Sequence, residues 1–294
     1  MKRSGDDEAT ASADFRAHAY SMSWRITVAT LLTLSAVSLP AILLGVLLAT
    51  DPPITPPILV RLVAVFAVVP GFAAWLIQRA LAAEVDLRGA KLVVRRRGVT
   101  LEIPCASIAR VTPWTVPLPG PGFSLAMRSG RRLRWGLQDA DPTPLLLALA
   151  EAGGVEAARS ATQHPNLVYA NVKRSVVRRW RWYHLAGKFV LLALGPTAVL
   201  FNAHQHIAYG GILGEYYLLG LRSYLETFGI YWTTVTIYLV LYASVWRGMA
   251  EGVALVTAHV APSRAARVRR AVETACRVVY YAGVPILLGI RFLP

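Results

Sequence analysis

The chain has 294 residues, of which 55% are hydrophobic and 16% are charged, and its mean hydropathy is +0.46. These values exclude a disordered protein, a collagen-like repeat and a small disulfide scaffold. Soluble domains average about 25% charged residues, and here the apolar residues form long uninterrupted runs, so we predict an integral membrane protein. Lys and Arg (31) exceed Asp and Glu (16), but no zinc-finger spacing, RNP motif or recognition-helix pattern accompanies them, so no nucleic-acid partner is expected.

Two apolar stretches in the first third of the chain predict a transmembrane hairpin at 26–82, after a cytoplasmic tail at 1–25. Residues 26–50 carry no charge, and 25 residues at 1.5 Å each exceed the roughly 30 Å of a bilayer core. The second stretch, 62–78, lies between Arg61 and Arg79, whose side chains can reach the interfaces. A signal peptide is the alternative for the first stretch. It is disfavoured because the stretch starts 25 residues into the chain and a second one follows at once.

Residues 83–154 change to short alternating segments separated by turns, which predicts a small antiparallel β domain. Strands are expected at 85–87, 91–97, 99–103, 108–112, 123–128 and 131–137. A helix is expected from Pro142 or Thr143 to Ala152, with Asp141 as its cap and two glycines at its end. The helix would close the sheet.

The predicted hairpin is followed in order by a strand Leu92–Arg96, a glycine turn, a strand ending Glu102-Ile-Pro104 and a strand Ile108–Val111. This order resembles the bacterial pleckstrin-homology-like membrane proteins over about residues 58–154. The resemblance implies a partly open barrel capped by a helix and used for binding rather than catalysis. The proline-rich stretch 113–122 departs from the pattern, because its prolines preclude a regular strand.

Basic side chains are the candidate contacts for anionic lipid headgroups or a protein partner. Strand alternation places Arg95 and Arg97 on one face of the sheet and Arg96 on the other. The linker 155–184 is expected to end in a basic amphipathic helix lying along the headgroups. We predict contacts at Arg95, Arg97, Arg131, Arg132, Arg134, Lys173, Arg174, Arg178, Arg179 and Arg181. A solvated positive face without lipid specificity is the alternative.

Residues 185–294 are predicted to form a second membrane domain with spans at 185–201, 227–246 and 278–290. The last has only 13 residues between two arginines, so it spans only if its ends snorkel or it begins earlier. Three segments beside the spans hold 28 of the 31 Lys and Arg residues. The positive-inside rule then places the amino terminus and residues 83–184 in the cytoplasm and the carboxyl terminus outside a bacterial-type inner membrane.

A metal site is the sharpest chemical hypothesis that the sequence offers. His204 and His206 follow the third predicted span, and histidines two apart can ligate one ion where the backbone is extended or turning. Glu215 can complete such a site. Ordinary interfacial histidines in a polar turn are the alternative. For haem, the corresponding candidates are His184 and His259 near the cytoplasmic face.

The predicted fold is thus an α-helical polytopic membrane protein with about five transmembrane helices and a small cytoplasmic antiparallel β domain. No GxSxG, HExxH, Walker or dinucleotide-binding signature is present in the sequence. We therefore predict a non-enzymatic scaffold, assembly factor or accessory subunit of a larger membrane complex, without a cofactor. Its predicted partners are anionic lipids and other membrane subunits. The alternative is a metal- or haem-binding membrane enzyme or subunit that uses His204 and His206, and a transporter is the third hypothesis.

Overall fold

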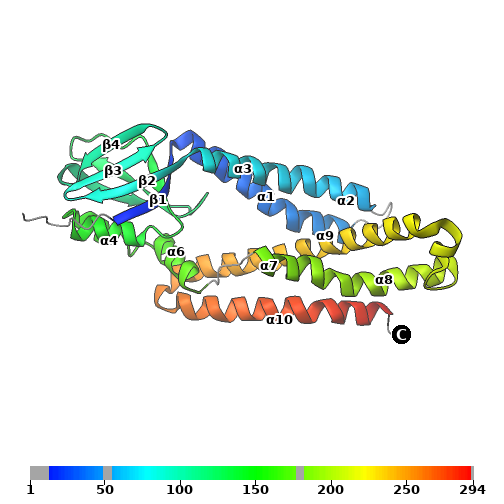
Figure 1. Ribbon diagram of the computed structural model, residues 1–294. Coiled ribbons are helices and arrows are strands. Elements are labelled where there is room, and N and C mark those ends of the chain that lie inside the picture. Colours follow the sequence, from blue (N-terminus) through cyan, green and yellow to red (C-terminus); the bar gives the residue numbers. More distant parts are fainter. Residues whose placement is uncertain (1–12, 49–54, 177–181, 293–294) are drawn as a thin grey trace, which may run out of the picture. The chain divides into compact units, whose positions relative to one another are not determined.

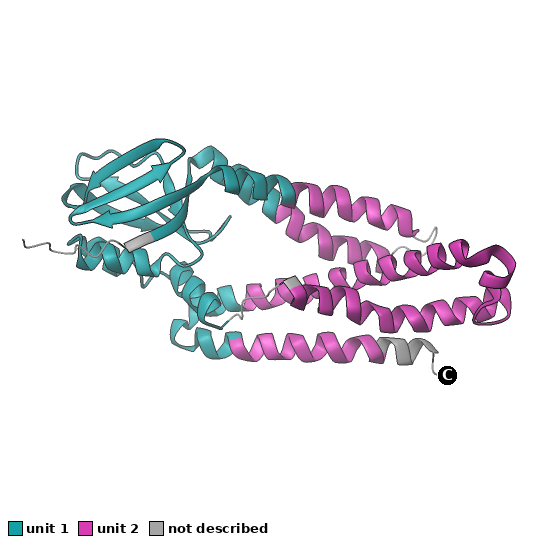
Figure 2. Cartoon of the chain, viewed as in Figure 1, with its two compact units in different colours: residues 1–32, 72–177, 254–269 teal, residues 33–71, 178–253, 270–294 magenta. Residues whose placement is uncertain are grey.

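The computed structural model describes residues 13–48, 55–176 and 182–292. The chain divides into two compact units, coloured differently in Figure 2. Unit 1 comprises residues 1–32, 72–177 and 254–269, and unit 2 comprises residues 33–71, 178–253 and 270–294.

Unit 1 is built around one antiparallel sheet that curls into a half-barrel (Figure 1). Its strand order is β4-β3-β2-β1-β7-β6-β5. The strands are β1 (Ala13–Tyr20), β2 (Ala82–Arg88), β3 (Lys91–Arg96), β4 (Val99–Pro104), β5 (Ile108–Pro113), β6 (Gly122–Met127) and β7 (Gly136–Gln138). A 3-10 turn, η2 (Cys105–Ser107), joins β4 to β5. The first five predicted strands are confirmed, because alternation of apolar and polar residues reports one buried face, and the sixth is confirmed only in part.

The last predicted strand, 131–137, is regular only at its end. Ala126 faces Arg132, whereas Phe123 faces Leu137. Between these two pairs, the β6 strand has two residues (124–125) and the opposite strand has four (133–136). The β7 side therefore carries two extra residues. This irregularity interrupts the ladder before Gly136, as a bulge does.

Strand β1 was not predicted, since residues 1–25 were expected to be a tail. It is the middle strand of the sheet and pairs with both β2 and β7. Ala17 and Ala19 are buried in the core, whereas Arg16 is exposed and His18 is half-buried, which is the ordinary pattern of a strand with one buried face. The small apolar side chains at these positions made the alternation weak in the sequence.

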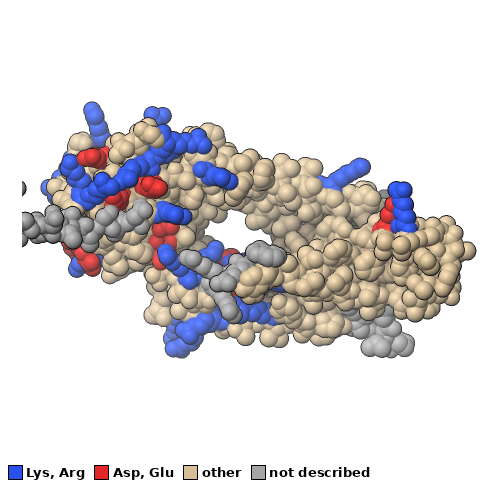
Figure 3. Space-filling view, viewed as in Figure 1, with Lys and Arg blue, Asp and Glu red and all other residues tan. Residues whose placement is uncertain are grey.

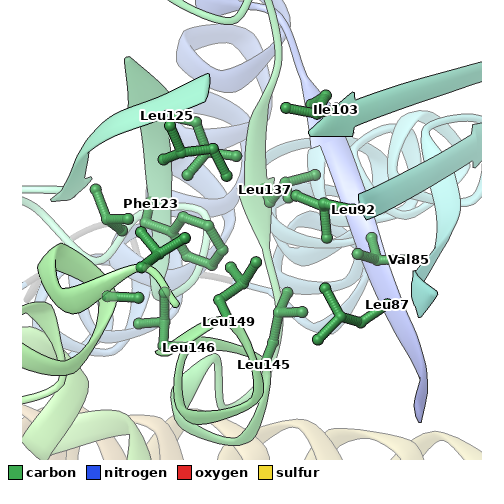
Figure 4. Packing of buried hydrophobic residues seen from close by; sticks show 14 of the residues in the cluster. Val85, Leu87, Leu92, Ile103, Phe123, Leu125, Leu137, Leu145, Leu146 and Leu149 are labelled. Carbon is green, nitrogen blue, oxygen red and sulfur yellow. The ribbon is translucent and has the colours of Figure 1, made fainter. Parts of the chain in front are cut away.

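Helix α4 (Thr143–Glu151) packs its leucines into the concave face of the sheet (Figure 4). Leu145, Leu146 and Leu149 are each at most 1% exposed and share a core with Phe123 and Leu137. Burial of such side chains stabilises a domain by about 1.5–3 kcal/mol each. The predicted helix is confirmed, and the Oδ1 atom of Asp141 accepts a hydrogen bond from the Thr143 amide at 3.1 Å.

The segment after α4 belongs to the same core and is not a free linker. Helix α5 (Glu156–Ala161) contributes Ala158 and Ala161, and helix α6 (Pro165–Val176) contributes Leu167. The β domain therefore extends past the predicted boundary at residue 154. The predicted amphipathic helix falls partly on residues 177–181, which lie outside the described residues.

Cys105 is 1% exposed in this core, and burial raises the pKa of its thiol. The thiolate is the reactive form, so the thiol stays protonated and shielded near neutral pH. We expect a maleimide to leave Cys105 unmodified in the folded protein and to modify it after denaturation in SDS, as read by mass spectrometry. Rapid modification in the folded state would contradict this packing.

Four helical segments of the described chain are long and apolar enough to cross a membrane: Met22–Leu48, Pro56–Ala80, Tyr183–Tyr209 and Gly214–Val260. The first is α1 (Met22–Leu48). The second comprises α2 (Pro56–Val63), the π-helical turn η1 (Ala64–Val68) and α3 (Val69–Ala80). These two segments confirm the predicted hairpin, and the Ser35 hydroxyl donates to the Ala67 carbonyl at 2.7 Å between them.

The remaining helices are α7 (Trp182–Leu185), η3 (Ala186–Leu191), α8 (Leu192–Tyr209), α9 (Gly214–Val260), η4 (Pro262–Arg264) and α10 (Ala265–Phe292). Within unit 2, Ala193, Val235, Leu239 and Tyr280 form a core between α8, α9 and α10. The fifth predicted span, 278–290, lies in α10. That helix carries six charged residues and is not among the four, so a fifth span stays a prediction.

Candidate functional site

The hairpin of apolar helices connects two paired strands of the sheet. β1 and β2 are antiparallel neighbours, and both hairpin helices lie between them in the chain. One residue, Ser21, separates β1 from α1, and one residue, Leu81, separates α3 from β2. The Ala19 amide donates to the Leu81 carbonyl at 3.0 Å, which extends the strand pairing to the first turn of the helices. The β domain is thereby fixed directly to the base of the hairpin.

A hollow of about 380 Å³ lies where the start of α1 meets the sheet. We call it the arginine pocket. It is lined by Ser21, Trp24, Arg96, Arg97, Val99, Arg134 and Trp135. The chain brings these residues together from three places: the start of α1 with the residue before it, the β3–β4 hairpin, and the segment before β7. Figure 3 shows Lys and Arg side chains gathered over the β strands, whereas the helices carry long uncharged stretches.

The arginines of this pocket are held in different ways. Arg96 donates to the Ala19 carbonyl at 3.2 Å, and its guanidinium lies 5.5 Å from the ring of Trp135. Arg97 and Arg134 are exposed, and no ion pair joins them to an acidic side chain in the described part of the chain. The pocket thus offers one fixed guanidinium and two that can turn toward a ligand.

The structure corrects the predicted grouping of the first arginine cluster. β3 ends at Arg96, and Arg97 has a positive φ of 40° in the turn with Gly98. Alternation therefore stops before Arg97, which joins Arg96 at the pocket instead of sharing a face with Arg95. Arg95 instead pairs with Asp86 at 3.4 Å.

The other predicted basic contacts do not line the pocket. Arg131 and Arg132 are exposed between β6 and β7. On α6, Lys173 lies 3.5 Å from the Tyr169 hydroxyl, and Arg174 lies 4.0 Å from Asp141. Arg178, Arg179 and Arg181 lie outside the described residues. Sequence reasoning therefore found Arg97 and Arg134 but missed their neighbours Arg96, Trp24 and Trp135.

Trp114 links three parts of unit 1 and was not singled out in the sequence. It is 4% exposed and packs with Val28 of α1 and Ala74 of α3. Its indole Nε1 atom donates to the Ser124 hydroxyl at 3.1 Å, and the Arg25 guanidinium lies 3.9 Å from the ring centroid. A tryptophan among prolines gives no sequence signal for such burial, because its neighbours come from the hairpin.

The two histidines of the metal hypothesis lie on a regular helix. His204 and His206 belong to the last turns of α8. Side chains two positions apart on a helix point in directions about 200° apart, so the two imidazoles lie on nearly opposite faces. The extended or turning backbone that the hypothesis required is not present there. His206 contacts the Asn202 carbonyl at 2.9 Å, and the His204 ring lies 5.3 Å from that of Tyr231. Within the described ranges, no three His, Cys, Asp or Glu side chains are grouped for a metal ion.

Glu215 has a different environment from the one predicted. It is 1% exposed, and its carboxylate accepts hydrogen bonds from Gln205 (2.6 Å), Ser223 (2.9 Å) and Thr227 (2.6 Å). Its own amide donates to the Gln205 side chain at 3.2 Å. The carboxylate therefore ties the end of α8 to α9 on both sides of Gly220, where a φ of +85° breaks the helix.

No protein-family model, curated protein or solved structure matches the chain. The resemblance of residues 58–154 to the bacterial pleckstrin-homology-like membrane proteins therefore stays a prediction. The structure itself gives a curled antiparallel sheet with α4 packed into its concave face. Function has to be argued from the residues of this chain.

Proposed function

We propose that this protein is a non-enzymatic, membrane-anchored binding protein whose β domain holds anionic lipid headgroups in the arginine pocket. In this proposal it acts as a scaffold, assembly factor or accessory subunit of a complex in a bacterial-type inner membrane. The observation that carries the proposal is the position of the pocket. Ser21 and Trp24 of its lining lie at the start of α1, a helix apolar enough to cross the bilayer.

The chemistry of the lining suits a phosphate-bearing headgroup. Guanidinium groups donate paired hydrogen bonds to phosphate oxygens, and three arginines line the pocket without an acidic residue among its lining. Trp24 and Trp135 have the amphipathic rings that settle at the level of the headgroups. The pleckstrin-homology-like resemblance and the half-barrel shape agree with a binding role.

The orientation in this proposal follows from charge. The segments that include the β domain hold most Lys and Arg residues, and the positive-inside rule places such segments in the cytoplasm. The cytoplasmic leaflet carries anionic lipids, and a basic residue near it contributes about 1 kcal/mol of attraction. The pocket would then face the leaflet whose headgroups it fits.

Headgroup binding is tested by comparing two double variants that remove the same charge. We expect Arg97→Gln with Arg134→Gln to weaken binding of short-chain phosphatidylglycerol by about 30-fold, since two basic residues contribute about 2 kcal/mol. The control, Arg131→Gln with Arg132→Gln, removes exposed arginines outside the pocket lining and should change the affinity less than about threefold. Affinities are measured on the full chain in neutral detergent by native mass spectrometry.

Equal losses in the two double variants would contradict a specific pocket and would favour a general positive surface. Comparable affinity for zwitterionic phosphatidylcholine would contradict the anionic ligand. The scaffold role is tested separately, by purifying the tagged full chain from its own membranes in mild detergent. A membrane-protein partner present in stoichiometric amount supports it, and a chain that purifies alone contradicts it.

A further inference from the structure

The connection between β5 and β6, residues 113–122, exposes apolar side chains that the headgroup proposal does not use. We call it the proline loop. It contains four prolines and no charged residue. Val116 is 52% exposed and Leu118 is 38% exposed, although Trp114 at the start of the loop is buried. An exposed apolar loop beside a membrane-spanning helix indicates contact with lipid.

The exposed side of this loop faces the start of α1 across a narrow groove. The groove has a volume of about 190 Å³. It is lined by Met22, Arg25, Ile26, Ala29, Thr30, Val116 and Leu118. Apart from Arg25 its lining is uncharged, and five of its seven residues belong to the first turns of α1. The groove therefore continues the apolar surface of a helix that can cross the membrane.

The proline loop is held in place from two sides. The Arg25 guanidinium donates to the carbonyls of Val116 (3.4 Å) and Leu118 (3.3 Å). The Asn166 side-chain amide of α6 donates to the carbonyls of Trp114 (2.6 Å) and Thr115 (2.8 Å). These four carbonyls are satisfied within the protein. Each carbonyl bonded in this way lowers the cost of bringing the loop into the leaflet, where an unpaired backbone group costs several kcal/mol.

The depth of the loop follows from its neighbours on α1. Arg25 is the last charged residue before the uncharged run of 25 residues. Thr30 lies five residues further, or about 7 Å along the helix axis. The proline loop contacts Arg25 directly, so the groove begins at the level of Arg25 and extends along Ile26, Ala29 and Thr30 into the uncharged run.

We propose that Val116 and Leu118 are inserted into the bilayer and that the groove beside them holds the acyl chain of a membrane lipid. The loop then acts as a second, shallow anchor that fixes the β domain against the leaflet. This inference uses other residues than the arginine pocket does, so either proposal can fail without the other. Its ligand is the hydrocarbon of the bilayer, whatever the headgroup.

Depth-dependent quenching tests the insertion. The full chain carries Leu118→Cys and Cys276→Ser, is labelled with the environment-sensitive fluorophore NBD, and is reconstituted in phosphatidylcholine vesicles containing acyl-brominated lipid. The matched control is Ser129→Cys, in an exposed turn of the same β domain. The protein with Cys276→Ser alone serves as the labelling blank, because Cys105 is buried.

We expect the label at position 118 to emit at shorter wavelength and to be quenched by brominated lipid at least twofold more than the label at position 129. Val116→Cys should behave like Leu118→Cys and guards against a local effect of one substitution. If both labels in the loop are quenched by aqueous iodide as strongly as the control, the loop lies in water and the proposal is wrong. That result would leave an apolar protein partner as the occupant of the groove.

Discussion

Replacement of Trp114 by alanine is expected to lower the free energy of unfolding by about 3–5 kcal/mol, the range for large aromatic side chains removed from a core. The indole is 4% exposed and packs with Val28 of α1 and Ala74 of α3. Its loss would leave a cavity and would remove the acceptor ring for Arg25, which lies 3.9 Å away. The Ser124 hydroxyl would also lose its indole partner.

The measurement is the midpoint of thermal unfolding of the full chain in neutral detergent. Trp75→Ala is the matched control, because this tryptophan of α3 is 47% exposed and its removal opens no cavity. Trp114→Phe should fall between the wild type and Trp114→Ala, since it keeps a ring but not the Nε1 donor. If the two alanine variants unfold at the same temperature, Trp114 does not connect the β domain to the hairpin as described.

Replacement of Glu215 by alanine is expected to destabilise unit 2 by about 2–4 kcal/mol, because a buried donor left without its acceptor costs about 1–3 kcal/mol. Three side-chain donors, from Gln205, Ser223 and Thr227, end on this one carboxylate. Gln205 is fully buried and has no route to water. The break at Gly220 lies inside the segment that these bonds hold together.

The control for Glu215 is Glu226→Ala on the same helix. Glu226 forms an exposed ion pair with Arg222, and such i,i+4 pairs contribute about 0.3–0.5 kcal/mol. Thermal unfolding in neutral detergent should therefore separate the two variants clearly. Similar midpoints for Glu215→Ala and Glu226→Ala would show that the carboxylate does not hold the connection between α8 and α9.

The sequence predicts well the features that have a periodic pattern of apolar residues or an uncharged run of characteristic length. Uncharged runs of span length mark the helices, and alternation marks the strands from β2 to β6. Helix α4 was also predictable, since Asp141 precedes a run of leucines and glycines follow it. Each of these signals lies within about 30 consecutive residues, so no distant partner is needed to read it.

The features that were missed depend on residues far apart in the chain. β1 pairs Phe15 with Val85, and the two are separated by the whole hairpin. Arg97 leaves its predicted face because Arg97 itself lies in a turn and has a positive φ. The histidine pair was expected in a turn, but α8 continues through both residues and ends only at Tyr209. Tertiary pairing and local backbone geometry decided these cases, and neither has a periodic signal.

The insertion of the hairpin between β1 and β2 has a consequence for how the molecule is made. During synthesis β1 emerges first, but its neighbours β2 and β7 follow only after both apolar helices of the hairpin. The half-barrel therefore closes only after both hairpin helices have been made, so completion of the β domain is coupled to completion of the hairpin. A fragment that starts at β2 would lack β1, the middle strand of the sheet. Strands β2 and β7 would then each have an unpaired edge, and such edges are prone to self-association.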